Sequence, residues 1–183
     1  MSTLTALVIA SIAITIFIIY NAIMIHIFGM PSSLSNTYYY LNKKWSGAGW
    51  AFTIMMLVVA GMLMVPWISI NAGISYWSHY LGFLPFLTCC CIIFVGFAPN
   101  FRTEDVVCGM HMWSAKLAAV FALLWVCVCC WKIMYILPIW VLVCGGIAHL
   151  TKTADSGRDW WLEMCAFGPT FTAIITEGIM QVI

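Results

Sequence analysis

The sequence predicts an all-α membrane protein, a polytopic transmembrane helical bundle with about six spanning helices. Of the 183 residues, 64% are hydrophobic and only 7% are charged, and the mean hydropathy is +1.05. Soluble domains carry about 45–50% apolar and about 25% charged residues. Seven basic and six acidic side chains cannot cover the surface of a soluble fold of this size. The composition therefore excludes a soluble enzyme, and the net charge of +1 leaves no basic face for a nucleic acid.

Six apolar runs are long enough to cross the hydrocarbon core of a bilayer, which takes roughly 20 residues of helix. In chain order they cover residues 4–28, 49–67, 81–98, 110–131, 133–150 and 161–183. The strands of a membrane barrel are about half as long and alternate apolar with polar residues. The runs show no such alternation, so we expect helices. Because little more than Lys132 separates the fourth run from the fifth, five helices with one long bent segment are the alternative.

The first three runs predict plain spanning helices. No basic segment precedes the first run, and it is long enough to span, so we expect a retained helix and not a signal peptide. Trp50, Trp67 and Trp77 lie near the ends of the second and third runs, where indole rings favour the membrane interface. The connections are short and no linker divides the chain. Residues 1–183 are therefore expected to form one transmembrane helical-bundle domain.

The fourth and fifth runs carry packing signals. At about 100° per residue, one narrow face of the fourth helix holds His111, Ala115, Ala118, Ala122 and Cys129. Small residues in such a stripe let helices approach closely in lipid, so His111 is expected to point into the bundle. Lys116 lies roughly 140° from His111 and is expected to snorkel to the interface. In the fifth run, Pro138 falls near the helix start, where proline is tolerated.

The sixth run carries a polar stripe. Glu163, Thr170 and Glu177 recur at heptad spacing and share one helix face. Such a stripe in a membrane helix should face protein or water, since ionisable side chains are costly in lipid. Pro169 removes a backbone donor and frees the carbonyl of Cys165. We therefore expect the sixth helix to be kinked, with Glu163, Thr170 and Glu177 lining a pathway.

The loop charges predict an orientation. Five basic residues fall in the first, third and fifth loops, namely Lys43, Lys44, Arg102, Lys152 and Arg158. The opposite side carries only Lys132. By the positive-inside rule, loops 29–48, 99–109 and 151–160 are expected in the cytoplasm, with both termini outside.

Imidazoles and carboxylates gather at the membrane interface next to the first, third and fifth loops. His111, His149, Asp105 and Glu163 are candidate catalytic residues there, and the first three are candidate metal ligands. Such a layer could form a metal site, a proton-handling site or a headgroup pocket, or its members could simply cap helices. Zinc or iron would suit it, but no His-x-x-x-His spacing occurs, so no cofactor is predicted. A bis-histidine haem would need histidine pairs at matched depth on facing helices, which this arrangement does not offer.

Two segments carry a resemblance to a known family. Residues 96–101 (GFAPNF) end one helix, and after a short acidic loop residues 107–111 (VCGMH) open the next. In this the chain resembles the bacterial branch of the Frag/DRAM/Sfk-like six-helix membrane proteins. The resemblance implies a six-helix bundle and assigns no catalytic residues. The expected location is a bacterial inner membrane. Eukaryotic members of that group keep both termini in the cytoplasm, the reverse of the orientation that the loop charges predict.

The leading functional hypothesis is a non-enzymatic multipass protein that assembles in the lipid bilayer. It would form a pore, a small-solute pathway or a membrane subunit of a complex, by self-association or with another membrane protein, and it would bind no nucleic acid. The alternative is an intramembrane metal-dependent hydrolase with its site in the His/carboxylate layer. Ser75-x-x-x-His79 with Asp105 and His111 faintly resembles the zinc layer of the ceramidase and progestin-receptor-like hydrolases, whose paired-histidine final helix is missing here.

Overall fold

The computed structural model describes residues 1–98, 105–151 and 157–183, and for residues 105–107 the backbone alone. Within these ranges the chain is helical and contains no strand. The elements, in chain order, are α1 (Thr3–Phe28), α2 (Thr37–Lys44), α3 (Trp50–Ile74), α4 (Tyr76–Tyr80), α5 (Phe83–Phe97), α6 (Asp105–Cys129), η1 (Trp131–Ile133), α7 (Ile136–Trp140), η2 (Val141–Gly145), α8 (Gly146–Leu150) and α9 (Arg158–Val182).

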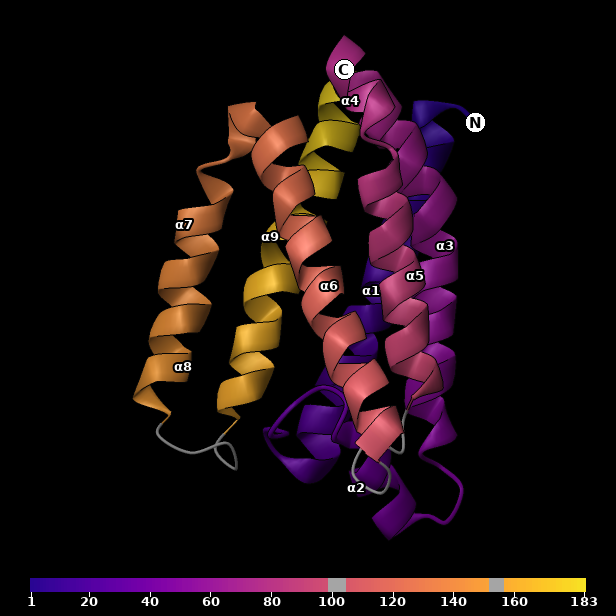
Figure 1. The fold of residues 1–183 in the computed structure, drawn as a ribbon, viewed down its shortest axis with the longest axis vertical. Coiled ribbons are helices and arrows are strands. Elements are labelled where there is room, and N and C mark those ends of the chain that lie inside the picture. Colours follow the sequence, from indigo (N-terminus) through magenta and orange to yellow (C-terminus); the bar gives the residue numbers. More distant parts are fainter. Residues whose placement is uncertain (99–104, 152–156) are drawn as a thin grey trace.

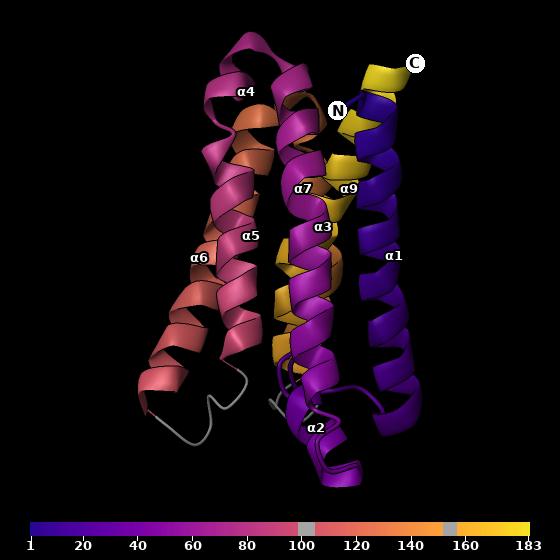
Figure 2. The ribbon, with the colours of Figure 1, turned by 90° about the vertical axis from the view of Figure 1, so that its right-hand side faces the viewer.

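The long helices lie side by side and alternate in direction (Figures 1 and 2). Both chain ends lie at one end of the bundle together with α4, whereas α2 lies at the opposite end. The chain turns back between α6 and α7, and α7, η2 and α8 follow one another as a single rod. The fourth and fifth apolar runs therefore form two rods and not one bent helix.

Three helical stretches are long and apolar enough to cross a membrane, namely Thr3–Phe28, Trp50–Ile74 and Cys108–Cys129. Phe83–Phe97 and Ile136–Leu150 are shorter apolar helices. These stretches support an all-helical protein compatible with integration into a membrane. Helix α9 runs unbroken through Pro169, which lies inside it.

Helix α3 continues to Ile74, seven residues beyond the end at Trp67 that the sequence predicts. The apolar run is interrupted by Ser69 and Asn71, which is why the sequence places the end earlier. In the structure the Asn71 side chain is fully buried and hydrogen-bonded, so its polar atoms do not stop the helix.

The core lies among α1, α3, α5, α6 and α9, with α5 packed against α3 and α6. Small residues let the helices approach: Ala6, Ala10 and Ala13 of α1 are fully buried, and a Cβ on Gly96 of α5 would lie 2.9 Å from Met56 Cβ of α3. The small-residue face predicted for the fourth helix is confirmed on α6. His111, Ala118, Ala122 and Cys129 are all buried there, and Lys116, off that face, is exposed.

The rod formed by α7, η2 and α8 lies at the edge of the bundle and packs mainly against α9. Its anchor is Trp140, whose ring lies over Gly168 and whose Nε1 donates to Thr172 Oγ1 at 3.2 Å. Leu142 and Val143, on the same rod, are exposed. A lipid surrounding would cover these apolar side chains, as expected for a membrane protein.

Candidate functional site

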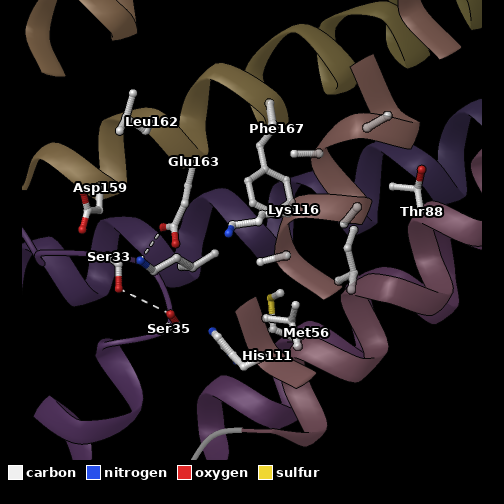
Figure 3. Close-up of a pocket in the computed structure, with 18 of the residues that line it drawn as sticks. Ser33, Ser35, Met56, Thr88, His111, Lys116, Asp159, Leu162, Glu163 and Phe167 are labelled. Carbon is white, nitrogen blue, oxygen red and sulfur yellow. Dashed lines mark hydrogen bonds between the residues drawn. The ribbon is translucent and has the colours of Figure 1, made fainter. Parts of the chain in front are cut away.

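A cavity of about 630 Å³ lies between α3, α5, α6 and α9. This volume falls within the range of small-molecule and cofactor sites, about 300–1,000 Å³. Most of the wall is apolar, with Phe52, Met56, Ile92 and Phe167 among the lining side chains. The polar side chains are concentrated toward the end of the bundle that holds α2 (Figure 3).

Two tryptophans lie at the inner end of the cavity. Trp67 lines it and packs edge-on against Trp125, with ring centroids 5.1 Å apart. Trp125 Nε1 donates to Asn71 Oδ1 at 2.8 Å, and the Asn71 amide donates to the carbonyl of Ser78 at 2.6 Å. Ser78 Oγ in turn donates to the Asn71 carbonyl at 2.6 Å. This buried network joins α3, α4 and α6 and fixes the tryptophan pair above the cavity.

Residues 32–36 form a polar wall at the other end. The chain leaves α1 at Gly29, whose φ of 76° favours glycine, and Pro31 follows. Ser32 is then held from two sides: its carbonyl accepts from Trp160 N at 3.0 Å, and its hydroxyl accepts from Asn36 Nδ2 at 2.6 Å. These bonds fold the segment back over the start of α9, so that its hydroxyl groups border the cavity.

Glu163 of α9 joins this wall. Its Oε2 accepts a hydrogen bond from Leu34 N at 2.6 Å, a bond between residues 129 positions apart in the chain. Ser33 and Ser35 also face the cavity, and their hydroxyl oxygens lie 3.4 Å apart. Because a charge-assisted bond of this length is among the stronger kinds, it fixes the carboxylate at the cavity end.

Three further charged side chains surround this end. Asp159 lines the cavity and pairs with Arg158 at 3.2 Å, an exposed contact. Lys116 enters from α6, and its ammonium lies 5.3 Å from the centre of the Trp113 ring. In Figure 3 the Lys116 amine points toward Glu163, yet Arg158–Asp159 is the single ion pair among the described residues. The charges of Lys116 and Glu163 therefore face one cavity without neutralising each other directly.

Two of the three residues predicted to line a pathway lie at the cavity, and the third does not. Glu163 and Thr170 both line the cavity. Glu177 does not contribute to its described lining; it is buried near the opposite end of α9, and its Oε1 accepts no hydrogen bond from the described residues. A pathway that continues from Thr170 past Glu177 stays a prediction.

The predicted His/carboxylate layer is brought together only in part. His111 lines the cavity, and its Nδ1 lies 3.1 Å from the carbonyl oxygen of Ala98, to which it can only donate. His149 is exposed on α8, which does not line the cavity. The side chain of Asp105 lies outside the described residues. The described part of the chain contains no group of three or more His, Cys, Asp or Glu placed to hold a metal ion, and a metal in this layer stays the alternative hypothesis.

Two features of the site are not predicted from the sequence. In the sequence, the polar wall at residues 32–36 is a cluster of serine and asparagine after Pro31. Such a cluster is equally typical of an ordinary loop. Lys116 is exposed, as snorkelling requires, but it also borders the cavity. The angular position of Lys116 on α6 predicts that it faces away from the packing face. It does not predict that α9 and the cavity lie on that side.

Comparison with models of known protein families, with curated proteins and with solved structures finds no match to this chain. The resemblance to the Frag/DRAM/Sfk-like proteins therefore stays a prediction. Since a fold alone does not determine activity, the function must be argued from the cavity.

Proposed function

We propose that this chain is an integral membrane protein that crosses the bilayer six times and takes a lipid-like amphiphile into its cavity. The observation that carries the proposal is the division of the cavity wall: apolar along its length, with serine, lysine and carboxylate side chains at one end. An amphiphile has the same division, an apolar chain joined to a polar head. The apolar wall can accept the chain from the bilayer without exposing it to water, and the polar end can bind the head group.

This proposal narrows the hypothesis of a pore, a small-solute pathway or a membrane subunit. A water-filled pore needs polar groups along its whole course, since dewetting closes a hydrophobic constriction. Here Leu63, Trp67 and Ala122 form an apolar inner end. A cavity of this kind suits uptake of a molecule from the bilayer better than passage of a hydrated solute. The hydrolase alternative would need a metal at His111. Donation of Nδ1 to the Ala98 carbonyl is compatible with a metal-binding histidine, but the described residues contain no group of three His, Cys, Asp or Glu that would complete such a site.

The cavity-filling test uses two neighbouring alanine and valine positions on α6. Ala119 lines the cavity, whereas Val120, the next residue, is 56% exposed on the outer surface. Ala119→Trp is expected to reduce co-purifying lipid about tenfold, equivalent to about 1.4 kcal/mol of lost binding. The matched control Val120→Trp is expected to leave it unchanged. Bound lipid is counted per chain by native mass spectrometry, with thermal melting to check folding.

Two outcomes of that experiment would overturn the proposal. One is an unsubstituted protein that releases no lipid when extracted. The other is equal lipid content in folded Ala119→Trp and Val120→Trp proteins, which would place the lipid on the outer surface.

The proposed setting is a bacterial inner membrane, with the α2 end of the bundle in the cytoplasm and α4 outside. Lys43 and Lys44 lie on α2, and Lys132 lies in η1 near the other end. Loops 29–48, 99–109 and 151–160 would then be cytoplasmic, although residues 99–104 and 152–156 lie outside the described ranges.

Cysteine labelling tests this orientation. Ser46 and Trp77 are both exposed, the first beside α2 and the second on α4. In spheroplasts, a membrane-impermeant maleimide is expected to label Trp77→Cys directly, and Ser46→Cys only after permeabilisation. The unsubstituted chain supplies the background from its own cysteines. The opposite labelling pattern would reverse the orientation and agree with the one that the Frag/DRAM/Sfk resemblance implies.

A further inference from the structure

We infer that the amphiphile is a membrane lipid with a zwitterionic head group, whose ammonium binds Glu163 and whose anionic group binds Lys116. This inference rests on the proposed function, because it names the kind of lipid that the cavity would take. It is carried by two opposite charges that face the same cavity from different helices and are not paired.

The first charge is the carboxylate of Glu163. Its Oε2 is used by Leu34 N, whereas Oε1 accepts no hydrogen bond from the described residues. A carboxylate removed from water costs free energy unless a cation or donors satisfy it. A primary ammonium can donate to Oε1 while the Leu34 bond stays in place. The Ser33 and Ser35 hydroxyls border the same space, and their mutual contact of 3.4 Å is long enough to yield to a ligand donor.

The second charge is the ammonium of Lys116. Its described interaction is with the face of the Trp113 ring, 5.3 Å from the ring centre, a weak contact at an exposed site. A phosphate or carboxylate group offers a lysine ammonium a stronger, charge-assisted partner. Since Lys116 comes from α6 and Glu163 from α9, one ligand head lying between the two helices reaches both.

The charge balance selects the net charge of the head group. Asp159 is compensated by Arg158. A head-group ammonium beside Glu163 holds it as a carboxylate, and Lys116 and Glu163 then sum to zero, so an overall neutral head that carries both signs matches them. A purely anionic head would leave its charge opposite Glu163, and a purely cationic head would leave its charge opposite Lys116. Like charges brought together in this way lower affinity and give selectivity.

The residues at the edge of the cavity indicate that the ligand enters from the bilayer. Met112 of α6 and Leu162 of α9 both line the cavity and are 45% and 51% exposed. These apolar side chains lie on the flank of the bundle, on two helices that pack against each other. An acyl chain can enter between them without leaving the apolar phase, which a water-soluble ligand would have to do.

The experiment reconstitutes the full chain in nanodiscs of equal parts phosphatidylethanolamine and phosphatidylglycerol with identical acyl chains. Retained lipid is identified by native mass spectrometry after transfer to mild detergent. The unsubstituted protein is expected to retain phosphatidylethanolamine about tenfold over phosphatidylglycerol. Phosphatidylglycerol has no ammonium for Glu163, so it lacks one close charge pair. Glu163→Gln is expected to abolish this preference while keeping total lipid, because the glutamine oxygen can still accept from Leu34 N. Lys116→Gln is expected to reduce phosphatidylethanolamine retention.

Lys44→Gln is the matched control. Lys44 also lies over an aromatic ring, 4.7 Å from the centre of Trp45, but outside the lining of the cavity. Its substitution is expected to leave the lipid ratio unchanged. If lipid is retained with no head-group preference, or if folded Glu163→Gln keeps the preference, the inference is wrong while the cavity proposal stands. If the unsubstituted protein retains no lipid at all, both fail together.

Discussion

Asn71→Leu is expected to lower the free energy of unfolding by about 1–3 kcal/mol, because it leaves the buried indole N–H of Trp125 without a partner. Trp125 Nε1 loses its acceptor, whereas the carbonyl of Ser78 loses the Asn71 amide but still accepts from Leu81 N at 2.9 Å. Both bonds are buried, and Asn71 and Trp125 are 0% exposed. The leucine cannot compensate, since its side chain neither donates nor accepts. The tryptophan pair at the inner end of the cavity also loses its anchor, so bound lipid should fall in the same variant.

A double-mutant cycle with Trp125→Phe measures this expected loss. Removing the indole N–H removes the unpaired donor, so the double variant should be less destabilised than the two single variants added together. Unfolding is followed in mixed detergent by circular dichroism. Ser69→Leu, on the same helix, is the control; its half-buried hydroxyl makes no hydrogen bond with the described residues. Strict additivity of Asn71→Leu and Trp125→Phe would show that the bond does not hold α3 to α6.

Helical periodicity predicts which way a side chain faces, but not what it meets. The angles on the fourth run place His111 inward and Lys116 away from the packing face, and the structure confirms both placements. That Lys116 faces the same cavity as Glu163 depends on α9 lying beside α6, a tertiary contact that no local pattern encodes.

The polar wall of the cavity depends even more on tertiary contacts that the local sequence does not encode. Residues 32–36 leave the helical bundle as a connection, and their composition predicts a loop. Their position is set by bonds to Glu163 and Trp160, more than 120 residues later in the chain. A single sequence contains both partners but no sign that they meet. The site is therefore visible only after the fold brings α9 to the end of α1.

The stripe Glu163, Thr170 and Glu177 shows the same limit along the helix axis. Heptad spacing correctly places Thr170 and Glu177 on buried positions. The depth at which the cavity ends is set by Trp67 and Trp125 of other helices, so Glu177 falls outside its described lining. Spacing predicts a common face, whereas the extent of the cavity follows from the bulk of side chains on α3 and α6.

Gly168→Val is expected to displace the rod formed by α7, η2 and α8 from α9. A Cβ at residue 168 would lie 2.6 Å from Cδ2 and Cζ3 of Trp140, and the indole is too rigid to bend away. Overpacking of this kind costs typically about 1–3 kcal/mol. The rod packs mainly against α9, and no other described helix offers it a surface of comparable size.

The readout is a cross-link between Cys144 of η2 and Cys165 of α9, whose thiols are close enough to interact. Mild oxidation of the unsubstituted chain is expected to join them, mapped by mass spectrometry, whereas Gly168→Val should reduce the yield severalfold. Gly61→Val on α3 is the matched control, because a Cβ there meets nothing within 4 Å.

Adding Trp140→Ala to Gly168→Val separates steric displacement from general unfolding. Removing the ring relieves the overlap with the new side chain, so the cross-link should return in the double variant although the Trp140–Thr172 hydrogen bond is gone. Gly168 does not belong to the described lining of the cavity, so lipid retention should persist in all these variants. Loss of lipid together with the rod would instead show that α9 needs the rod to hold its place against α6.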